Sequence, residues 1–140
     1  MRRLAMLSLA FVLGACASDD PTDAGGSASR TIEVSMSDEL RFEPAELAVA
    51  PGETVRFEVT NDGDTVHEFL MGDEAAQAEF EEEMAGGEMD HDTGAGVSVE
   101  PGHTETFDYT FASEEGEILA GCHEPGHYHA GMVATITISH

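Results

Sequence analysis

No lysine occurs in this chain, and its five basic residues, all arginines, stand against 29 acidic ones. The formal net charge is −24 at pH 7. A surface of this sign repels phosphate backbones, so the composition excludes nucleic acid as a partner. Two interpretations of the acidity remain open. One is a redox protein partner with a basic docking surface, and the other is life at high salt, where ions screen the self-repulsion.

Cysteine is scarce as well, and the first of the two cysteines lies near the N-terminus. Arg2 and Arg3 precede an apolar run over residues 4–13, an order typical of a secretory signal peptide. The run is too short to span a bilayer. Its ending, Leu13-Gly14-Ala15-Cys16, resembles a bacterial lipobox, which implies lipidation of Cys16 and attachment to the extracytoplasmic face of the cell membrane. The alternative is an ordinary signal peptide that is cleaved near Ala15 or Ala17.

Three segments follow from this interpretation. Residues 1–15 are predicted to be a lipoprotein signal peptide, and residues 16–30, which are small, polar and acidic, a disordered tether. Residues 31–140 suit one domain of ordinary size. If Cys16 carries lipid, Cys122 has no disulfide partner in an oxidising compartment. A lone exported thiol needs a reason to exist, and metal ligation supplies one.

The segment around Cys122 has the spacing Cys-x4-His-x4-Met, formed by Cys122, His127 and Met132 just before a β-like run over residues 133–139. A thiolate, an imidazole and a thioether suit copper that cycles between its two oxidation states. His67 is placed to supply a second imidazole from elsewhere in the chain. Together the four residues form the His2Cys trigonal set with a weak axial methionine that characterises a type 1, or blue, copper site.

Residues 31–140 resemble the cupredoxin family of small blue copper proteins, to which plastocyanin and azurin belong. The resemblance rests on the segment from Cys122 to Met132, called the ligand loop from here on, on residues 42–57 and on Asn61. Within the ligand loop, the turn Pro125-Gly126-His127 is similar to that of azurin. It implies one type 1 copper ion, held by His67, Cys122, His127 and Met132. It also implies that His127 reaches the surface and serves as the port for electrons.

Period-two alternation of apolar and polar residues predicts short strands, each with one buried face. Turn signals stand between them at Pro51-Gly52, Asn61-Asp62-Gly63 and Pro101-Gly102. Seven or eight such strands without a long helix predict an all-β fold, an antiparallel Greek-key β-sandwich. The alternating apolar residues are Ile32, Val34 and Met36; Leu47 and Val49; Val55, Phe57 and Val59; Phe107, Tyr109 and Phe111; and Ala134, Ile136 and Ile138.

An insertion after the strand that bears His67 interrupts this pattern. Asp73 is suited to cap a short helix over residues 74–85, which would end at Gly86-Gly87. Its apolar positions are Ala75, Ala78, Phe80 and Met84. An acidic loop follows it. One interpretation is a second, labile copper site formed by Met84, Met89 and His91, with His103 as a further donor. The other is a solvated loop and a helix that covers one end of the barrel.

Two functions from different classes fit these features, and no nucleophile–base pair suggests an enzyme. The first is a membrane-tethered electron carrier outside the cytoplasm, which the complete type 1 ligand set favours. The alternative is a copper-binding protein for copper tolerance or delivery, favoured by the extra His123 and His129. A multicopper oxidase would need a histidine in place of Gly121, histidine pairs on another domain and a longer chain.

Overall fold

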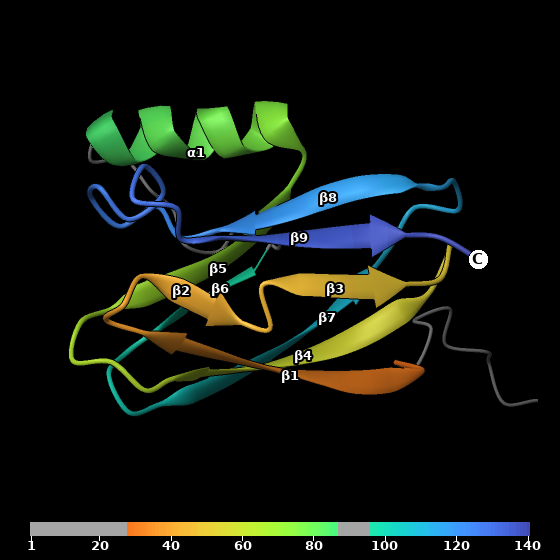
Figure 1. Ribbon diagram of the computed structural model, residues 1–140, viewed down its shortest axis with the longest axis horizontal. Helices are drawn as coiled ribbons and strands as arrows, with labels where there is room; N and C mark the ends of the chain where they lie inside the picture. The colour runs from red at the N-terminus through yellow and green to blue at the C-terminus, as the bar shows by residue number, and fades with distance from the viewer. Residues whose placement is uncertain (1–27, 87–95) are drawn as a thin grey trace, which may run out of the picture.

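The computed structural model describes residues 28–86 and 96–140 and shows two β-sheets packed face to face (Figure 1). The first sheet holds β1 (Arg30–Ser37), β2 (Arg41–Glu43), β4 (Thr54–Asn61) and β7 (Thr104–Thr110), in the spatial order β2-β1-β4-β7. The second sheet holds β3 (Glu46–Val49), β5 (His67–Gly72), β6 (Gly96–Val99), β8 (Gly116–Gly121) and β9 (Val133–Ile138), in the order β3-β9-β8-β5-β6. One helix, α1 (Glu74–Gly86), lies against β5 and β8. Within the described residues, no helix is long and apolar enough to cross a membrane.

The core lies between the sheets and is formed by the alternating residues that the sequence indicated. In β1, β4 and β9 every second residue is buried, so the predicted sandwich and the inward face of these strands are confirmed. Phe42 meets Phe69 edge to face across the sandwich with ring centroids 5.1 Å apart, and Phe57 packs against Phe69 at 5.5 Å. Aromatic contacts of this geometry join the two sheets and stabilise them beyond the area they bury.

Two strand pairs differ from the antiparallel arrangement expected throughout. β1 pairs with β4, and β3 pairs with β9, in parallel. The described residues also form nine strands instead of seven or eight, because the short β2 and β3 are separate elements in different sheets. Alternation along one strand shows which face is buried, but it contains no information on the direction of the neighbouring strand. The direction is fixed by where the chain changes sheets.

The insertion is a helix with bounds one residue longer than predicted. The backbone N–H of Ala76 donates a hydrogen bond to the carboxylate of Asp73 at 2.9 Å, which confirms the expected cap. The predicted apolar stripe was wrong, because Ala75 and Ala78 are exposed. The one fully buried helix residue is Gln77. By covering β5, the helix leaves all six residues of that strand buried, as in a strand with both faces covered.

Strand β1 begins one residue before the predicted start of the domain at residue 31. Ser29 donates its backbone N–H to the carbonyl of Thr54, and β1 begins at Arg30. The predicted signal peptide, Cys16 and the tether up to residue 27 lie outside the described residues, as do Met89 and His91.

Candidate metal centre

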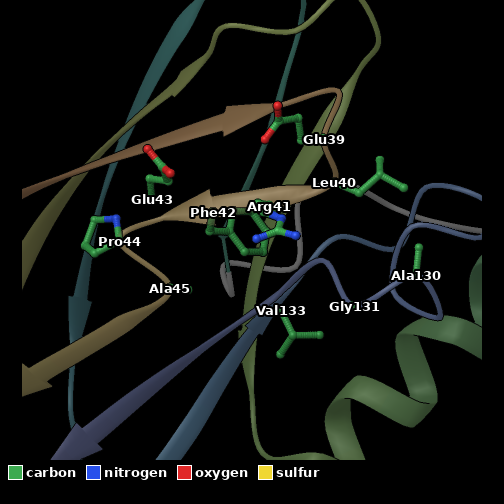
Figure 2. Close-up of a pocket in the computed structure, with 10 residues that line it drawn as sticks. All are labelled: Glu39, Leu40, Arg41, Phe42, Glu43, Pro44, Ala45, Ala130, Gly131 and Val133. Carbon is green, nitrogen blue, oxygen red and sulfur yellow. The ribbon is translucent and has the colours of Figure 1, made fainter.

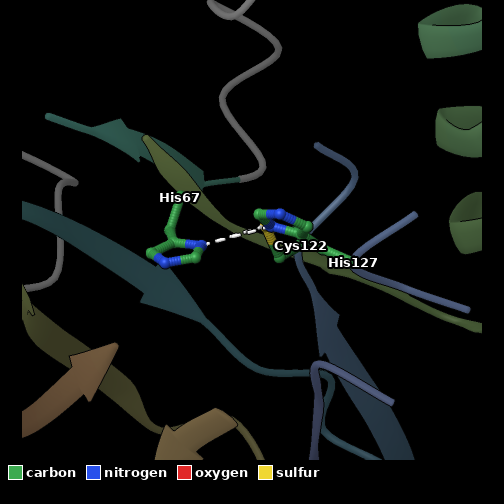
Figure 3. A group of neighbouring side chains, drawn as sticks. All are labelled: His67, Cys122 and His127. Atoms are coloured by element: carbon green, nitrogen blue, oxygen red, sulfur yellow. Dashed lines mark hydrogen bonds between the residues drawn. The ribbon is translucent and has the colours of Figure 1, made fainter. Parts of the chain in front are cut away.

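Three donor atoms from two separate parts of the chain converge at one end of the sandwich (Figure 3). His67 begins β5, whereas Cys122 and His127 lie in the loop between β8 and β9. Nδ1 of His67 is 3.3 Å from Nδ1 of His127, and Sγ of Cys122 is 3.9 Å from the nitrogen of His67 and 3.4 Å from that of His127. In the described part of the chain, this is the one group of three His, Cys, Asp or Glu side chains whose donor atoms all lie within 4.8 Å of one another.

The size of this triangle fits a transition-metal ion. A point equidistant from the three atoms lies about 2.1 Å from each, close to the usual lengths of bonds from a divalent metal ion to nitrogen and sulfur. Both histidines turn the same ring nitrogen inward. Two imidazoles and a thiolate in a trigonal arrangement are the donor set that copper takes in electron-transfer sites.

Backbone hydrogen bonds hold the ligand loop in shape. The N–H of Cys122 donates to the carbonyl of Met132, and the N–H of Met132 donates to the carbonyl of His127, each at 3.1 Å. These bonds bring the two ends of the Cys-x4-His-x4-Met segment together. Gly126 and Gly131 have φ angles of 86° and 95°, which a side chain would disfavour. The Cys-x4-His-x4-Met spacing therefore corresponds to a single loop whose two ends are hydrogen-bonded to each other.

Met132, the predicted axial ligand, is fully buried on this loop. Its backbone contacts with Cys122 and His127 place it at the centre, although its role as a ligand stays a prediction. Thioether sulfur is a weak ligand whose main effect is on the redox potential.

Asn61 fixes the segment that leads to His67. Its amide nitrogen donates to the carbonyls of Thr65 and Val99 at 2.7 and 2.8 Å, and its side-chain oxygen accepts the N–H of Gly63. The far nitrogen of His67, Nε2, lies 3.6 Å from a carboxylate oxygen of Asp38. A carboxylate behind a metal-binding histidine favours the ring orientation in which the inner nitrogen is free to bind.

Burial sets the protonation of the ligands before metal binds. It raises the pKa of the Cys122 thiol to about 11, although backbone N–H groups of Glu68 and Glu124 act in the other direction. The N–H of Glu68 points at Sγ from 3.4 Å. Burial, and then the nearby His127, lower the pKa of His67, so its imidazole is available as a neutral ligand. A bound metal ion displaces the thiol proton.

Helix α1 is joined to the ligand loop by a buried polar network. The side-chain nitrogen of Gln77 donates to the carbonyl of Leu70 at 3.0 Å, so its oxygen accepts from Nε2 of His123 at 2.7 Å. Nδ1 of His123 lies 2.8 Å from Glu81. Burial lowers the pKa of His123, and the hydrogen bond and charge of Glu81 oppose that effect only in part. Both ring nitrogens of His123 face side-chain oxygens. The second oxygen of Glu81 lies 3.0 Å from His129.

This network accounts for the histidines that the type 1 site leaves over. His123 is fully occupied by Gln77 and Glu81, and the ring of Tyr128 stacks on it at 4.7 Å. A Cβ added at Gly121 would collide with Gln77, His123 and Tyr128, so the residue that an oxidase needs has no room here. Sequence reasoning missed Gln77 and Glu81, because nothing in an acidic helix marks the one face that contacts the loop.

Of the three residues proposed from the sequence for a second copper site, only Met84 lies within the described residues, and that site stays a prediction. Met84 lines a pocket of about 230 Å³ between α1 and the ligand loop, whereas Met89 and His91 lie outside the described residues. His103 is not part of this pocket. It is exposed in the turn before β7, where its ring lies 3.1 Å from the carbonyl of Pro101.

A larger groove of about 670 Å³ runs along the other side of the ligand loop (Figure 2). Residues 39–45, which include β2, form one wall, and Ala130, Gly131 and Val133 form the other. The guanidinium of Arg41 lies among these side chains in Figure 2. Its lining residues do not form a group of metal ligands, so we assign no metal site to this groove.

The fold and the site together define the class of protein to which this chain belongs. A two-sheet sandwich with two histidines and a cysteine at one end, and a buried methionine on the same loop, is the architecture of a small copper protein with a type 1 site. Residues 28–139 match the plastocyanin/azurin family of copper binding proteins, and the chain belongs to that family. Its cofactor is copper.

Three related sequences share a name. The copper-resistant cuproprotein CopI of Pseudomonas aeruginosa is 32% identical, and the match covers 95% of this chain and 93% of that one. CopI of Rubrivivax gelatinosus is 39% identical over 84% of this chain and 71% of its own length. CopI of Vibrio cholerae is 32% identical over 81% of this chain and 68% of its own.

Solved structures confirm the cupredoxin fold. The reduced auracyanin of Roseiflexus castenholzii superposes with a TM-score of 0.69 at 24% identity, and covers 81% of this chain and 100% of its own. Auracyanin A of Chloroflexus aurantiacus, described as a blue copper protein, superposes with a TM-score of 0.65 at 22% identity. The match covers 78% of this chain and 98% of auracyanin A.

Proposed function

We propose that this chain is an extracytoplasmic copper-resistance protein whose type 1 centre keeps its copper as a redox-active cofactor. The observation that carries the proposal is the similarity, over nearly the whole of both chains, to a protein named copper-resistant cuproprotein. The same name on two further relatives supports it. This shared name favours copper tolerance, which the sequence left open as the alternative function, over general electron transport.

The burial of the donors supports copper as a cofactor and not as cargo. Cys122, His67 and Met132 are all 0% exposed, and the loop that bears two of them is closed by backbone bonds. A delivery protein needs donors that a partner or chelator reaches. Bound copper would supply a one-electron couple between copper(II) and copper(I). The protein's part is to hold Cys122 as a thiolate and keep both imidazoles in place, so that the geometry changes little between the two states.

A membrane-tethered electron carrier is the second candidate. His127 is the one ligand among the four that is only half-buried, so its ring edge offers a route for electrons to the surface. Attachment through lipid on Cys16 would keep such a carrier beside membrane-bound partners. A Cys16→Ser protein should then leave the detergent phase in a partitioning assay, whereas an ordinary signal peptide predicts no change.

Growth in copper separates resistance from electron transport. A strain that lacks this protein should grow poorly in excess copper, and expression of the wild-type chain should restore growth. Complementation with Cys122→Ser should fail, because the centre is lost. If copper tolerance is unchanged in the deletion strain while respiration or photosynthesis slows, the carrier is correct and the resistance proposal is not.

The rate at which a chelator removes copper(I) separates cofactor from cargo. For a buried cofactor site, removal should be limited by opening of the loop, so the rate should not rise with chelator concentration. A rate proportional to chelator concentration would show an accessible cargo site instead. The matched sample is His127→Ala, in which one position is open and removal should be fast.

A further inference from the structure

The pocket between α1 and the ligand loop gathers three kinds of metal donor outside the type 1 centre. The helix contributes the carboxylate of Glu81 and the thioether of Met84, and the loop contributes the imidazole of His129. Pro125 and Gly126, which precede the ligand His127, form part of the same wall. The pocket has a volume of about 230 Å³, enough for a hydrated ion to enter.

Two of these donors already stand at the separation of neighbouring metal ligands. Oε2 of Glu81 is 3.0 Å from Nε2 of His129. Two atoms bound at about 2.1 Å to one ion and at a right angle to each other are about 3 Å apart. A metal ion could bind both atoms without moving either side chain far.

His123 orients the carboxylate for this role. Its Nδ1 engages Oε1 of Glu81 at 2.8 Å, so Oε2 is left to face the pocket and His129. His123 is itself fixed by Gln77 and buried. A carboxylate held in this way through its other oxygen is arranged as metal-binding groups usually are, by a partner behind the ligand.

The donors disfavour calcium and magnesium, and because imidazole and carboxylate suit zinc as well as copper, it is the thioether that favours copper. Calcium and magnesium prefer oxygen ligands only, whereas imidazole suits copper and a thioether favours copper(I). The side chain of His129 is 80% exposed, and that of Glu81 is 23% exposed, so an ion there would exchange with solvent. The net charge of −24 raises the local concentration of cations around such a site.

We propose that Glu81, His129 and Met84 form a second, exchangeable copper site beside the type 1 centre. The site goes beyond the proposed function and does not depend on whether the chain confers resistance or carries electrons. It also differs from the site expected from sequence, since it takes its imidazole from the ligand loop in place of residue 91. Because Glu81 is hydrogen-bonded to the residue that follows Cys122, copper in the second site should slightly shift the thiolate absorption of the first.

Titration of the copper-loaded protein with copper(II), followed by electron paramagnetic resonance, tests the proposal. One further equivalent should bind and give a second signal, with the wide copper splitting and nitrogen coupling of a site with mixed nitrogen and oxygen ligands. His129→Ala and Glu81→Gln should each weaken this binding by about tenfold or more. The matched variants His103→Ala and Glu83→Gln, on an exposed turn and on the exposed face of α1, should bind like the wild type. The absorption of the type 1 centre reports that each variant is folded.

Copper(I) tests the thioether separately. In competition with a colorimetric copper(I) chelator, Met84→Leu should bind the second ion about tenfold more weakly while its copper(II) titration stays unchanged, and Met89→Leu should bind like the wild type. The proposal is wrong if the wild type takes up no second equivalent, or if uptake survives both His129→Ala and Glu81→Gln. Loss of the site in His91→Ala, but not in His129→Ala, would place it in the acidic loop and also overturn the proposal.

Discussion

Cys122 is the residue on which the centre depends most. Its sulfur is buried, and burial raises the pKa of the thiol to about 11, so the metal-free protein holds a protonated thiol at neutral pH. Two histidine nitrogens lie within 4 Å of this sulfur, and the N–H of Glu68 points at it, so a thiolate formed on metal binding would have a hydrogen-bond donor in place. No other described residue supplies sulfur of this donor strength to the triangle. The intense colour of a type 1 site comes from this sulfur.

Replacing Cys122 by serine should therefore abolish the intense absorption of the copper-loaded protein and leave the sandwich folded. Serine fits the space of cysteine, and the core around it is shared by both sheets. Absorption and circular dichroism spectra measure the two effects. Cys16→Ser is the matched control, because it removes the only other cysteine and should keep the band. A band that persists in Cys122→Ser would refute the centre.

As the predicted axial ligand, Met132 should set the reduction potential of the centre. Met132→Leu should retain a coloured site and raise its reduction potential, because a weak donor to copper(II) is lost. A tenfold weakening of copper(II) relative to copper(I) corresponds to about 59 mV, and we expect a shift of that size. Met36→Leu, another fully buried methionine, in β1, should leave the potential unchanged. Equal potentials in wild type and Met132→Leu would show that Met132 is not a ligand.

At the scale of elements, Glu53 ties the first strand to the turn before β4. Its carboxylate accepts hydrogen bonds from Ser29 Oγ at 2.7 Å and from Arg30 Nε and the N–H of Ala50 at 2.9 Å. The hydrogen bond from Arg30, followed by those from Ala50 and Ser29, lowers the pKa of Glu53 from 4.5 to about 2. A lowered pKa in the folded state stabilises the fold above pH 4.5, and this contribution is lost as the pH falls towards 2.

Glu53→Gln should accordingly lower the free energy of unfolding by about 1 to 2 kcal/mol at pH 7, and the difference from the wild type should shrink between pH 4.5 and 2. Urea unfolding at several pH values measures it. Glu115→Gln, at an exposed carboxylate before β8, controls for the general loss of negative charge. A difference that stays constant down to pH 2 would mean that the carboxylate of Glu53 is not held as described.

The elements also show what a sequence predicts and what it leaves out. The convergence of Cys122 and His127, with Met132 buried on the same loop, was predictable, because candidate metal ligands are identified by donor chemistry and by their spacing within one loop. His67 followed from the need for a fourth ligand, and the helix from its cap at Asp73. The inward faces of the strands followed from alternation.

Contacts between distant elements were not predictable in the same way. The parallel pairing of β1 with β4 depends on the point where the chain changes sheets. The buried face of α1 is marked by a single amide, Gln77, whose partners lie in β5, in β8 and on the ligand loop. A polar residue in a helix usually indicates the solvent side, so the hydrophobic pattern pointed to the wrong face.

At the scale of the whole molecule, negative charge dominates. Arg56 is paired with Asp108 and Arg30 with Glu53, which leaves Arg41 as the one arginine of residues 28–86 and 96–140 without an ion pair to a carboxylate. The half-buried His127 lies close in sequence to the exposed Pro125 and Ala130, which contribute a small and partly apolar surface to the ligand loop. Transient redox encounters bury areas at the low end of the range for interfaces. Net charge would then guide the approach, and the apolar surface would form the contact.

Electron transfer to a cationic cytochrome should slow as salt is added, if the acidity serves to attract a basic partner. The screening length falls from about 30 Å at 0.01 M salt to about 3 Å at 1 M, so attraction from most of the surface is removed over this range. We expect the second-order rate constant, measured by stopped flow, to fall by at least about tenfold. A small uncharged oxidant is the control, and its rate should hardly change, because it feels no net field. A rate to the cytochrome that is equally independent of salt would show that the charge serves solubility in a salty environment, and the copper centre would be unaffected by that result.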